Sequence, residues 1–555
     1  MVRRSPGVFG LVLGLVWVSS AIAGPDTGGA LQQVPPVPSI PLVPPKIEVE
    51  RATGSVPSFP DSMGLQINLQ ELRFQGNTVF SAAQLNALVQ FIKGAPVNLL
   101  QLRAMAQIIT AHYQSAGYVA AQAYLPPQNI SDGIVLIAIA EGHYGKIVVQ
   151  NQTQISSGVI AGLMDQLAAG DLVRTYTLDS QLQTLGKLPG TQLKSRLVPG
   201  PLPGTSDLLI NIAPTQRLMG ALDADNAGND YTGAYRIGGT LYLNEPLGQG
   251  DIASLRLLNS LSGLNYVNAN YQMLAGHATF GGEFSSLSYA LGKEFKSLAA
   301  SGNVVAAKLY GSYPILNSVD RNLTVKLIFE SKNFRDYVAT VGSIADKSSQ
   351  LITGAISADN RDAFGSGGSS AASLSWSLGN LQYQSLAQWS LDSQTANMNG
   401  QFSKLAFALQ RTQYVSPGFS LYGAVSGQIA SKNLDPSEKM ELGGMFGVRA
   451  YPEGEAYGDN AMLATVQAQW QFANYFPHTQ FLTFYDAGTV EINASPWLAD
   501  TNTRHLQAAG IGVRWDNGGE YSIRIDAAHK FGSESAQSAK DADNRVWVQA
   551  VRYFQ

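Results

Sequence analysis

The chain has 555 residues, of which 14% are charged and none is cysteine, and its formal net charge is −4. A typical soluble protein has about 25% charged residues, so the composition argues against a large soluble enzyme. The missing cysteines exclude disulfides and cysteine-ligated metals, and the acidic balance argues against a general nucleic-acid-binding surface. No apolar run after the N-terminal segment reaches the roughly 18 residues of a membrane helix. Low charge with 56 glycines instead fits a β-barrel that faces lipid outside and water inside.

The N-terminus has the form of a signal peptide. Arg3 and Arg4 supply a positive segment, residues 7–18 an apolar one, and Ala21-Ile22-Ala23 a small-x-small cleavage site. We therefore expect residues 1–23 to be removed on export. An exported chain without a membrane helix is still able to span a membrane, as a closed barrel.

A proline-rich linker is expected after the cleavage site. Residues 24–64 hold nine of the 25 prolines, a density that excludes regular helix or sheet and predicts an extended segment. The exception is a short helix from Asp26 to Gln33, with Asp26 or Thr27 as its N-cap. The alternative for this stretch is disorder.

Residues 65–142 show the pattern of a small α+β unit in the order β-α-α-β-β. The first strand is expected at Ile67–Phe74, where apolar and polar residues alternate. Ser81 and Asn98 are the expected N-caps of two helices, the first of which carries Ile92 on its apolar face. The remaining strands are predicted at Val119–Leu125 and Ile134–Ile139.

Residues 143–215 repeat this order, so the two segments form an internal repeat. The expected elements are a strand at 146–150, helices at 156–167 and 177–185, and strands at 192–198 and 208–212. A Pro-Gly-rich turn joins the last two strands. The sequence therefore predicts two consecutive α+β units before the rest of the chain.

From residue 216 to 555 a strict two-residue alternation predicts strands. Residues 371–378 alternate apolar side chains with serine, and residues 462–471 alternate them with threonine and glutamine. About 340 residues remain, and a membrane strand needs roughly 9–11, so about sixteen strands fit. The polar second face favours a wet lumen over a soluble β-sandwich or propeller. We predict a mainly β fold, a transmembrane antiparallel β-barrel of about 16 strands preceded by two α+β domains.

Residues that could carry chemistry do not gather in the sequence. The six histidines are scattered, and no H-E-x-x-H motif occurs. Gly365-Ser366-Gly367-Gly368 lacks the lysine and the strand–helix context of a phosphate loop. Asp223 and Asp225 stand beside asparagines and glycines, which we interpret as a polar turn. We expect no enzymatic activity, no metal and no cofactor.

Two segments of the predicted barrel depart from the alternation. Residues 443–455 are rich in glycine, carry a single arginine at Arg449, and are predicted to form a loop between two strands. Downstream, Asp486 is a lone acid in an aromatic strand that includes Phe484 and Gly488. An arginine on a long loop reaches such an acid if the loop folds into the lumen.

With these motifs the chain resembles the two-partner secretion transporters of the outer membrane (TpsB), the haemolysin secretion/activation family ShlB/FhaC/HecB. That family belongs to the superfamily of barrels with periplasmic POTRA (polypeptide-transport-associated) domains. Its V-R-G-Y loop motif resembles Val448-Arg449-Ala450-Tyr451, and its F-x-D-x-G motif resembles Phe484-Tyr485-Asp486-Ala487-Gly488. The first POTRA motif resembles residues 117–142, and the barrel entry resembles residues 226–248. The resemblance covers essentially the whole mature chain.

The resemblance implies the division of the chain and its function. The implied segments are a signal peptide (1–23), a linker with a possible short plug helix (24–64), POTRA 1 (65–142), POTRA 2 (143–215) and an outer-membrane β-barrel (216–555). A large Sec-exported exoprotein of the haemolysin, adhesin or contact-dependent toxin type would bind the POTRA domains in the periplasm of a Gram-negative cell. It would add as an extended strand and thread through the barrel. The implied partners are this exoprotein and outer-membrane lipid, with no nucleotide and no nucleic acid.

The resemblance also implies roles for residues. Arg449 on the inward-folded loop is expected to pair with Asp486 on the barrel wall and to hold the loop in its conducting register. The loop and wall motif as a whole comprises Val448, Arg449, Ala450, Tyr451, Phe484, Asp486 and Gly488. The POTRA candidates for partner binding are Tyr118, Tyr124, Leu125 and Pro126. Ala450 replaces the family's glycine, which costs about 1–2 kcal/mol if the position needs positive φ.

Two other functions stay open. A barrel-assembly insertase of the same superfamily would normally carry more than the two POTRA units that fit between residues 65 and 215. A general porin has no use for two periplasmic α+β domains. Secretion of the partner exoprotein separates these functions.

Overall fold

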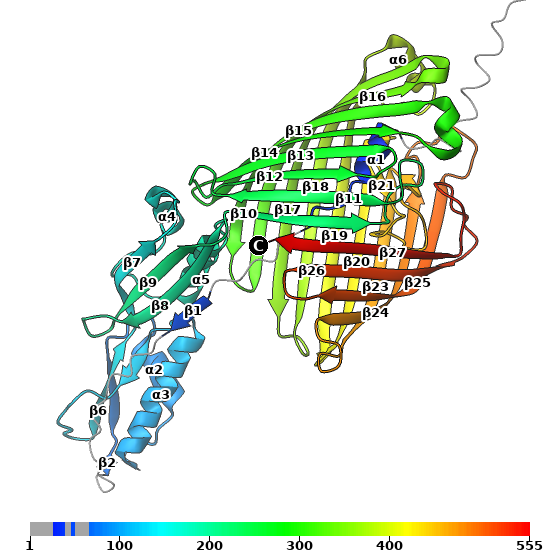
Figure 1. Cartoon of the computed structure of the whole chain (residues 1–555). Coiled ribbons are helices and arrows are strands. Elements are labelled where there is room, and N and C mark those ends of the chain that lie inside the picture. Colours follow the sequence, from blue (N-terminus) through cyan, green and yellow to red (C-terminus); the bar gives the residue numbers. More distant parts are fainter. Residues whose placement is uncertain (1–25, 39–45, 50–65, 555) are drawn as a thin grey trace, which may run out of the picture.

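The structure is a computed structural model that describes residues 26–38, 46–49 and 66–554 (Figure 1). The expected signal peptide and most of the proline-rich linker lie outside these ranges. The described chain forms two small α+β units in a row and then a closed barrel. Within the described ranges, no helix combines the length and the apolar character needed to cross a membrane.

The first α+β unit contains two helices with reciprocal caps. Its elements are β2 (Ile67–Asn68), β3 (Glu71–Gln75), α2 (Ala82–Val89), β4 (Pro96–Val97), α3 (Leu99–Ser115), β5 (Gln122–Tyr124) and β6 (Ile134–Ala140). The main sheet has the order β3-β6-β5, and β2 pairs with β4. Ser81 and Asn98 each accept a bond from the amide three residues on, and the glutamine there accepts from their own amide. Both predicted caps are thus confirmed as capping boxes.

Two details of this unit differ from the prediction. The expected strand Ile67–Phe74 is broken, because the amides of Leu69 and Gln70 donate to loop carbonyls instead of a strand partner. The first helix ends at Val89, since Gln90 has a φ of 24° and leaves the helical conformation. Ile92 therefore lies beyond the helix and is 79% exposed instead of buried.

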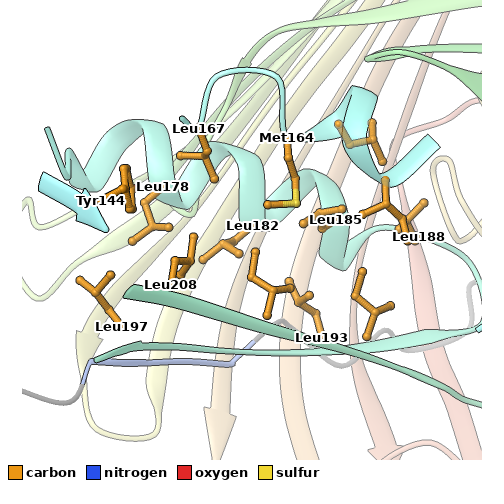
Figure 2. Packing of buried hydrophobic residues seen from close by; sticks show 14 of the residues in the cluster. Tyr144, Met164, Leu167, Leu178, Leu182, Leu185, Leu188, Leu193, Leu197 and Leu208 are labelled. Carbon is orange, nitrogen blue, oxygen red and sulfur yellow. The ribbon is translucent and has the colours of Figure 1, made fainter. Parts of the chain in front are cut away.

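The second unit repeats the same order of elements, as predicted. It consists of β7 (His143–Asn151), α4 (Ser157–Leu163), α5 (Thr175–Gly186), β8 (Thr191–Pro199) and β9 (Thr205–Pro214). α5 presents Leu178, Leu182 and Leu185 to the sheet, where they pack near leucines of β8 and β9 (Figure 2). These side chains form the hydrophobic core of the unit.

The linker contributes a strand to this second sheet, which the proline-based prediction excluded. β1 (Lys46–Val49) pairs in parallel with β8, so the sheet order is β1-β8-β9-β7. The prediction was wrong because these four residues, which follow Pro44-Pro45, contain no proline and keep their backbone amides for pairing. A second linker element, α1 (Thr27–Gln32), lies where the sequence predicts a short helix and is capped by Asp26.

The barrel closes on itself through sixteen antiparallel strands of the described chain, which confirms the predicted fold class. The strands are β10 (Leu218–Asp225), β11 (Arg236–Asn244), β12 (Ile252–Asn259), β13 (Leu264–Ala275), β14 (Ala278–Ala290), β15 (Ala300–Asn317), β16 (Arg321–Val338), β17 (Ser343–Asp362), β18 (Gly368–Tyr383), β19 (Gly400–Ser416), β20 (Phe419–Ala430), β23 (Asn460–Gln471), β24 (Thr479–Glu491), β25 (Thr503–Asp516), β26 (Tyr521–Phe531) and β27 (Asn544–Phe554). β10 pairs with β27 from Gly220 against Phe554 to Asp225 against Gln549, so the barrel has no open edge.

Side chains sort onto two faces of the barrel with the predicted period. Leu374, Trp376 and Leu378 of β18 are exposed on its outer surface, as are alternate apolar residues of the neighbouring strands. On the other face, the hydroxyls of Thr353 and Ser377 bond to each other at 2.8 Å. An apolar outer surface around a polar interior is the arrangement that a lipid bilayer requires.

Asp223 and Asp225 lie in β10, not in the polar turn that their neighbours indicate. Asp223 accepts two bonds from Arg256, at 2.8 and 3.0 Å, and Asp225 accepts one from Arg236 at 2.8 Å. All four side chains are at most 4% exposed. The turn interpretation was wrong because the opposite charges come from later strands of the sheet. Arg236 belongs to β11 and Arg256 to β12.

The second α+β unit is attached to three strand-to-strand turns at one end of the barrel (Figure 1). One polar contact is formed at each turn by Ser156 amide to Gly248 carbonyl (2.9 Å), His277 Nε2 to Asp165 Oδ1 (3.0 Å) and Lys187 Nζ to Asn317 Oδ1 (2.6 Å), and Asn317 Nδ2 also donates to the Thr184 hydroxyl (2.7 Å). β10 begins at this same end, and β27 ends there. The unit therefore lies against the end of the barrel at which the chain enters and leaves the sheet.

Candidate functional site

The loop between β20 and β23 folds into the barrel. This inward loop (residues 431–459) contains two short strands, β21 (Met440–Glu441) and β22 (Tyr457–Gly458), which pair and bring its two ends together. Val448, Ala450 and Tyr451 of the loop are at most 1% exposed. They belong to one hydrophobic cluster with the wall residues Leu482, Phe484, Leu506 and Ala508.

The two charged residues that stand out in the sequence meet inside the barrel. Arg449 donates through Nε and Nη2 to different oxygens of the Asp486 carboxylate, each at 2.8 Å. The backbone amide of Arg449 also donates to Asp486 Oδ2, at 3.3 Å. The side chains are 3% and 0% exposed. A planar two-point contact of this kind fixes the orientation of the loop as well as its position.

Residues of the strand motif complete the environment of the pair. The Arg449 guanidinium lies 3.3 Å from the centre of the Phe484 ring, in cation–π contact. The hydroxyl of Thr465 donates to Asp486 Oδ1 at 2.9 Å. At Gly488 a Cβ would lie 3.0 Å from a methyl group of Leu442 in the inward loop. The strand motif thus supplies an acid, an aromatic face and room for the loop.

Four further residues around Arg449 were not predicted from the sequence. The indole of Trp547 donates to the Arg449 carbonyl at 2.7 Å. Asp526 lies 3.7 Å from Arg449 Nη1 and accepts bonds from Arg514 and Arg524, at 2.9 and 2.7 Å. The three charged residues lie on two consecutive strands, β25 and β26, and their charge alone does not say which residues will meet. Trp547 is one of several aromatic residues in β27 and has no separate signal in the sequence.

Ala450 occupies its place without backbone strain. It is absent from the described residues that have a positive φ, so the penalty considered for a residue in place of glycine does not apply. The loop needs glycine elsewhere. At Gly447 a Cβ would lie 2.1 Å from the carbonyl oxygen of Leu442, a distance that no side chain tolerates.

The inward loop has a second attachment that is independent of Asp486. Glu455 is fully buried, forms an ion pair with Arg504 of β25, and accepts bonds from the amides of Gln537 and Ser538 at 2.8 and 2.7 Å. The hydroxyl of Tyr451 donates to a carbonyl of the same 532–543 loop, at 3.1 Å. The loop between β26 and β27 thereby fixes the inward loop at Tyr451 and Glu455.

Helix α1 lies inside the barrel, between the wall and the inward loop (Figure 1). On the wall side, Thr27 donates to Asp336 of β16 through its amide (3.0 Å) and its hydroxyl (2.8 Å). Asp26 lies 3.1 Å from Lys347 Nζ of β17. On the loop side, the Gln32 amide group donates to two carbonyls of the inward loop, at 2.8 and 2.6 Å. The helix and the loop therefore occupy the lumen together.

The structure places the four POTRA candidates for partner binding in different surroundings. Tyr118 is partly buried and packs edge-on against Phe80 and Tyr113. Tyr124 lies on the edge strand β5 and is 42% exposed. Leu125 and Pro126 follow it and are both partly buried. Of these residues, Tyr124 offers the most surface to a partner.

Comparison with known proteins identifies relatives of this chain over most of its length. A family model described as POTRA domain, ShlB-type, matches residues 67–142, and one described as haemolysin secretion/activation protein ShlB/FhaC/HecB matches residues 204–515. The heme/hemopexin transporter protein HuxB of Haemophilus influenzae is 26% identical, over 98% of this chain and 97% of its own. The outer membrane transporter CdiB of Dickeya dadantii is 21% identical, over 73% of this chain and 72% of its own. The solved structure of CdiB from Escherichia coli shares the fold, with a TM-score of 0.67 and 16% identity over 91% and 94% of the two chains.

Proposed function

Because the chain belongs to the haemolysin secretion/activation family ShlB/FhaC/HecB, we propose that it recognises one large exoprotein through its POTRA domains and threads it through the barrel. As a member of that family it is an outer-membrane transporter of two-partner secretion, which exports a partner exoprotein, and it is not an enzyme.

The observation that carries the proposal is the buried pair of Arg449 and Asp486. It holds the inward loop within the lumen, where α1 also lies, so segments of the chain itself occupy the path. Removing one partner of a buried ion pair typically costs about 3–5 kcal/mol, and a wet lumen lowers this. A general porin has no need of a loop held in this way. A transporter that opens for one partner does.

The route follows from the chemistry of an unfolded chain. An exoprotein that reaches the periplasm unfolded exposes backbone groups, and these add to the edge of a POTRA sheet as an extended strand. Backbone hydrogen bonds tolerate many sequences, while apolar positions set which partner is accepted. The outer membrane offers no nucleotide source, so we propose that folding outside the cell drives export.

The partner is proposed to be a single large exoprotein of the haemolysin, adhesin or contact-dependent toxin type. The chain is similar over nearly its whole length to the heme/hemopexin transporter protein HuxB. We therefore add an exoprotein that binds heme or hemopexin to these proposed types. The division of the chain at residues 142/143 and 215/216 is also proposed. It is supported by the change of sheet between β6 and β7, and between β9 and the barrel.

The test is secretion of the exoprotein that is encoded beside this chain. The two are co-expressed, and the medium is assayed for wild type, for Arg449→Ala and for the control Arg411→Ala. Arg411 forms a similar two-point pair with Asp362, but both side chains are about one-third exposed. Heat-dependent migration in gels shows whether each barrel is folded.

We expect secretion by wild type and Arg411→Ala, and none by a folded Arg449→Ala variant. Secretion by all three would leave the transporter in place but remove Arg449 from its mechanism. A folded wild type that secretes nothing would contradict this partner and favour an insertase of the same superfamily.

A further inference from the structure

The second POTRA sheet has an edge that the chain fills with its own linker. β1 pairs in parallel with β8 through four registered residues, from Lys46 beside Lys194 to Val49 beside Leu197. β8 has nine residues, so β1 covers less than half of its length. This edge is therefore able to take up an extended segment in parallel orientation.

The side-chain pattern of β8 defines which segment fits this edge. Leu193, Ser195 and Leu197 are buried, whereas Lys194 and Arg196 are exposed. Registered residues of neighbouring strands share a face of the sheet. β1 has the sequence Lys-Ile-Glu-Val, so its apolar residues are in register with the buried positions and its charged residues with the exposed ones. A segment with the same alternation of apolar and polar residues replaces it without loss of register.

The other sheet edges of the two POTRA domains are less suited to an incoming strand. On β5, the Thr110 hydroxyl of α3 accepts the amide of Ala123 at 2.9 Å, so a helix side chain already uses that edge. β3 carries the exposed pair Glu71 and Arg73, and charged edge strands resist pairing. The start of β7 is covered, because the amide of Tyr144 donates to the 170–172 loop at 2.8 Å.

The strand on β8 is also the anchor of the segment that carries α1. From α1 the described linker runs along the barrel wall, where Arg236 donates to the carbonyl of Gln33 and Tyr242 to that of Pro38. β1 is the next element of the described chain after α1, and it joins this segment to the second POTRA domain. Release of β1 from β8 removes that attachment, which weakens the retention of α1 in the lumen.

We propose that an extended segment of the exported chain replaces β1 on β8, in parallel orientation, and thereby loosens α1 from the lumen. This inference rests on the proposed function, since the occupant is the exoprotein. The docking edge is β8, the displaced segment is β1, and the entering strand runs parallel to β8. Binding at the POTRA domain and opening of the pore are thus parts of one exchange.

A disulfide between β1 and β8 tests the exchange. The natural chain has no cysteine, so Glu48→Cys with Arg196→Cys gives a single cross-link between registered residues. The matched control is Arg196→Cys with Leu209→Cys, which joins β8 to β9 in the same sheet and leaves β1 free. Both variants are co-expressed with the exoprotein and assayed with and without reductant.

We expect the β1–β8 cross-link to reduce secretion at least tenfold when oxidised, with recovery on reduction, while the control secretes in both states. Equal secretion by the two oxidised variants overturns the exchange and leaves the transporter function intact. Failure of wild type and control to secrete overturns the proposed function instead, and with it the exoprotein as occupant.

A second measurement needs no partner. Replacement of Lys46–Val49 by Gly-Ser-Gly-Ser in the full chain removes the strand, and single-channel recordings in planar bilayers count pore openings. We expect several-fold more frequent openings than in wild type, because α1 has then lost its attachment to the second POTRA domain. An unchanged frequency overturns the link between β1 and α1.

Discussion

The indole N–H of Trp547 donates a hydrogen bond to the backbone carbonyl of Arg449, at 2.7 Å. Trp547 belongs to β27, the last strand of the barrel, which also closes the barrel against β10. The side chain of Arg449 pairs with Asp486 on β24. One loop residue is therefore held by two separate strands, through its backbone and through its side chain.

The variant Trp547→Phe removes the donor and keeps the aromatic ring. A buried carbonyl left without its partner costs about 1–3 kcal/mol, so we expect a folded barrel with weaker retention of the inward loop and several-fold lower secretion. The control is Trp376→Phe on the outer surface, where the side chain is 58% exposed. Equal secretion by the two variants would show that the indole bond is dispensable.

A double-mutant cycle measures the pairing of Arg449 with Asp486. The unfolding free energies of Arg449→Ala, Asp486→Ala and the double variant are compared with wild type in detergent. Because the pair is bidentate and nearly inaccessible, we expect a coupling energy of about 1–3 kcal/mol. Additive single effects would mean that the two residues act independently and that the contact does not hold the loop.

The parts of this fold that local patterns encode were predictable. Period-two alternation identifies a strand wherever one face is apolar, and caps such as Ser81 and Asn98 mark helix starts within a few residues. The pair of Arg449 and Asp486 was predictable from the family motifs, because each motif fixes one partner. All of these predictions could be made without knowing which strands pair to close the barrel.

Contacts that depend on closure were not predictable. Asp223 reaches Arg256 only because β10, β11 and β12 are neighbours in a complete sheet. Thr27 and Asp336 are 309 positions apart and meet because the linker returns into the lumen. The parallel strand β1 was missed because prolines around it dominated the composition of the linker. In each case the order of strands in the folded sheet, or the path of the linker, decides which residues meet. A local sequence pattern does not contain that information.

The contact between Thr27 and Asp336 predicts how firmly α1 is held. Thr27→Val keeps the backbone bond to Asp336 but removes the hydroxyl bond of 2.8 Å. A hydrogen bond to a charged group contributes about 1.5 kcal/mol or more, so we expect about tenfold more frequent openings in planar bilayers. The control Thr353→Val removes a hydroxyl bond to Ser377 on the barrel wall. Equal opening frequencies in the two variants would contradict a plug role for α1.

Glu141 predicts an acid-sensitive POTRA domain. Burial raises the pKa of its carboxyl, but hydrogen bonds from Thr78, Val79 and Tyr113 outweigh this and lower the pKa below the ordinary 4.5. A lowered pKa in the folded state gives stability that is present above the unfolded-state value and is lost as the pH falls through the lowered pKa.

The matching substitutions are Glu141→Gln and the control Glu71→Gln, whose side chain is 52% exposed. Hydrogen–deuterium exchange of the α3 amides, corrected for intrinsic pH dependence, reports the stability of the first POTRA domain. We expect Glu141→Gln to cost about 1–3 kcal/mol at pH 7 and to flatten the pH dependence. We expect no measurable change from the control. The role of Glu141 would be contradicted if the wild-type domain were equally stable at pH values above and below the pKa range of carboxyl groups.

The inward loop predicts opposite results at two neighbouring small residues. Ala450 has no positive φ, so Ala450→Gly restores the family's motif without relieving strain. It adds backbone freedom that costs roughly 0.5–1 kcal/mol, and we expect secretion to stay at or slightly below the wild-type level. Gly447→Ala instead forces a Cβ to within 2.1 Å of the Leu442 carbonyl. The Leu442 carbonyl belongs to the backbone and cannot move aside as a flexible side chain does. We therefore expect the inward loop to lose its packed position in the lumen and secretion to be lost.

Both variants are compared in the secretion assay, with barrel folding checked by heat-dependent migration. A gain of secretion in Ala450→Gly would mean that the conducting loop passes through a left-handed conformation at residue 450 which the resting loop does not have. Full secretion by Gly447→Ala would mean that the packed arrangement of the inward loop is not needed during export. The two variants together therefore distinguish the backbone conformation that the resting loop requires from the one that the loop requires during export.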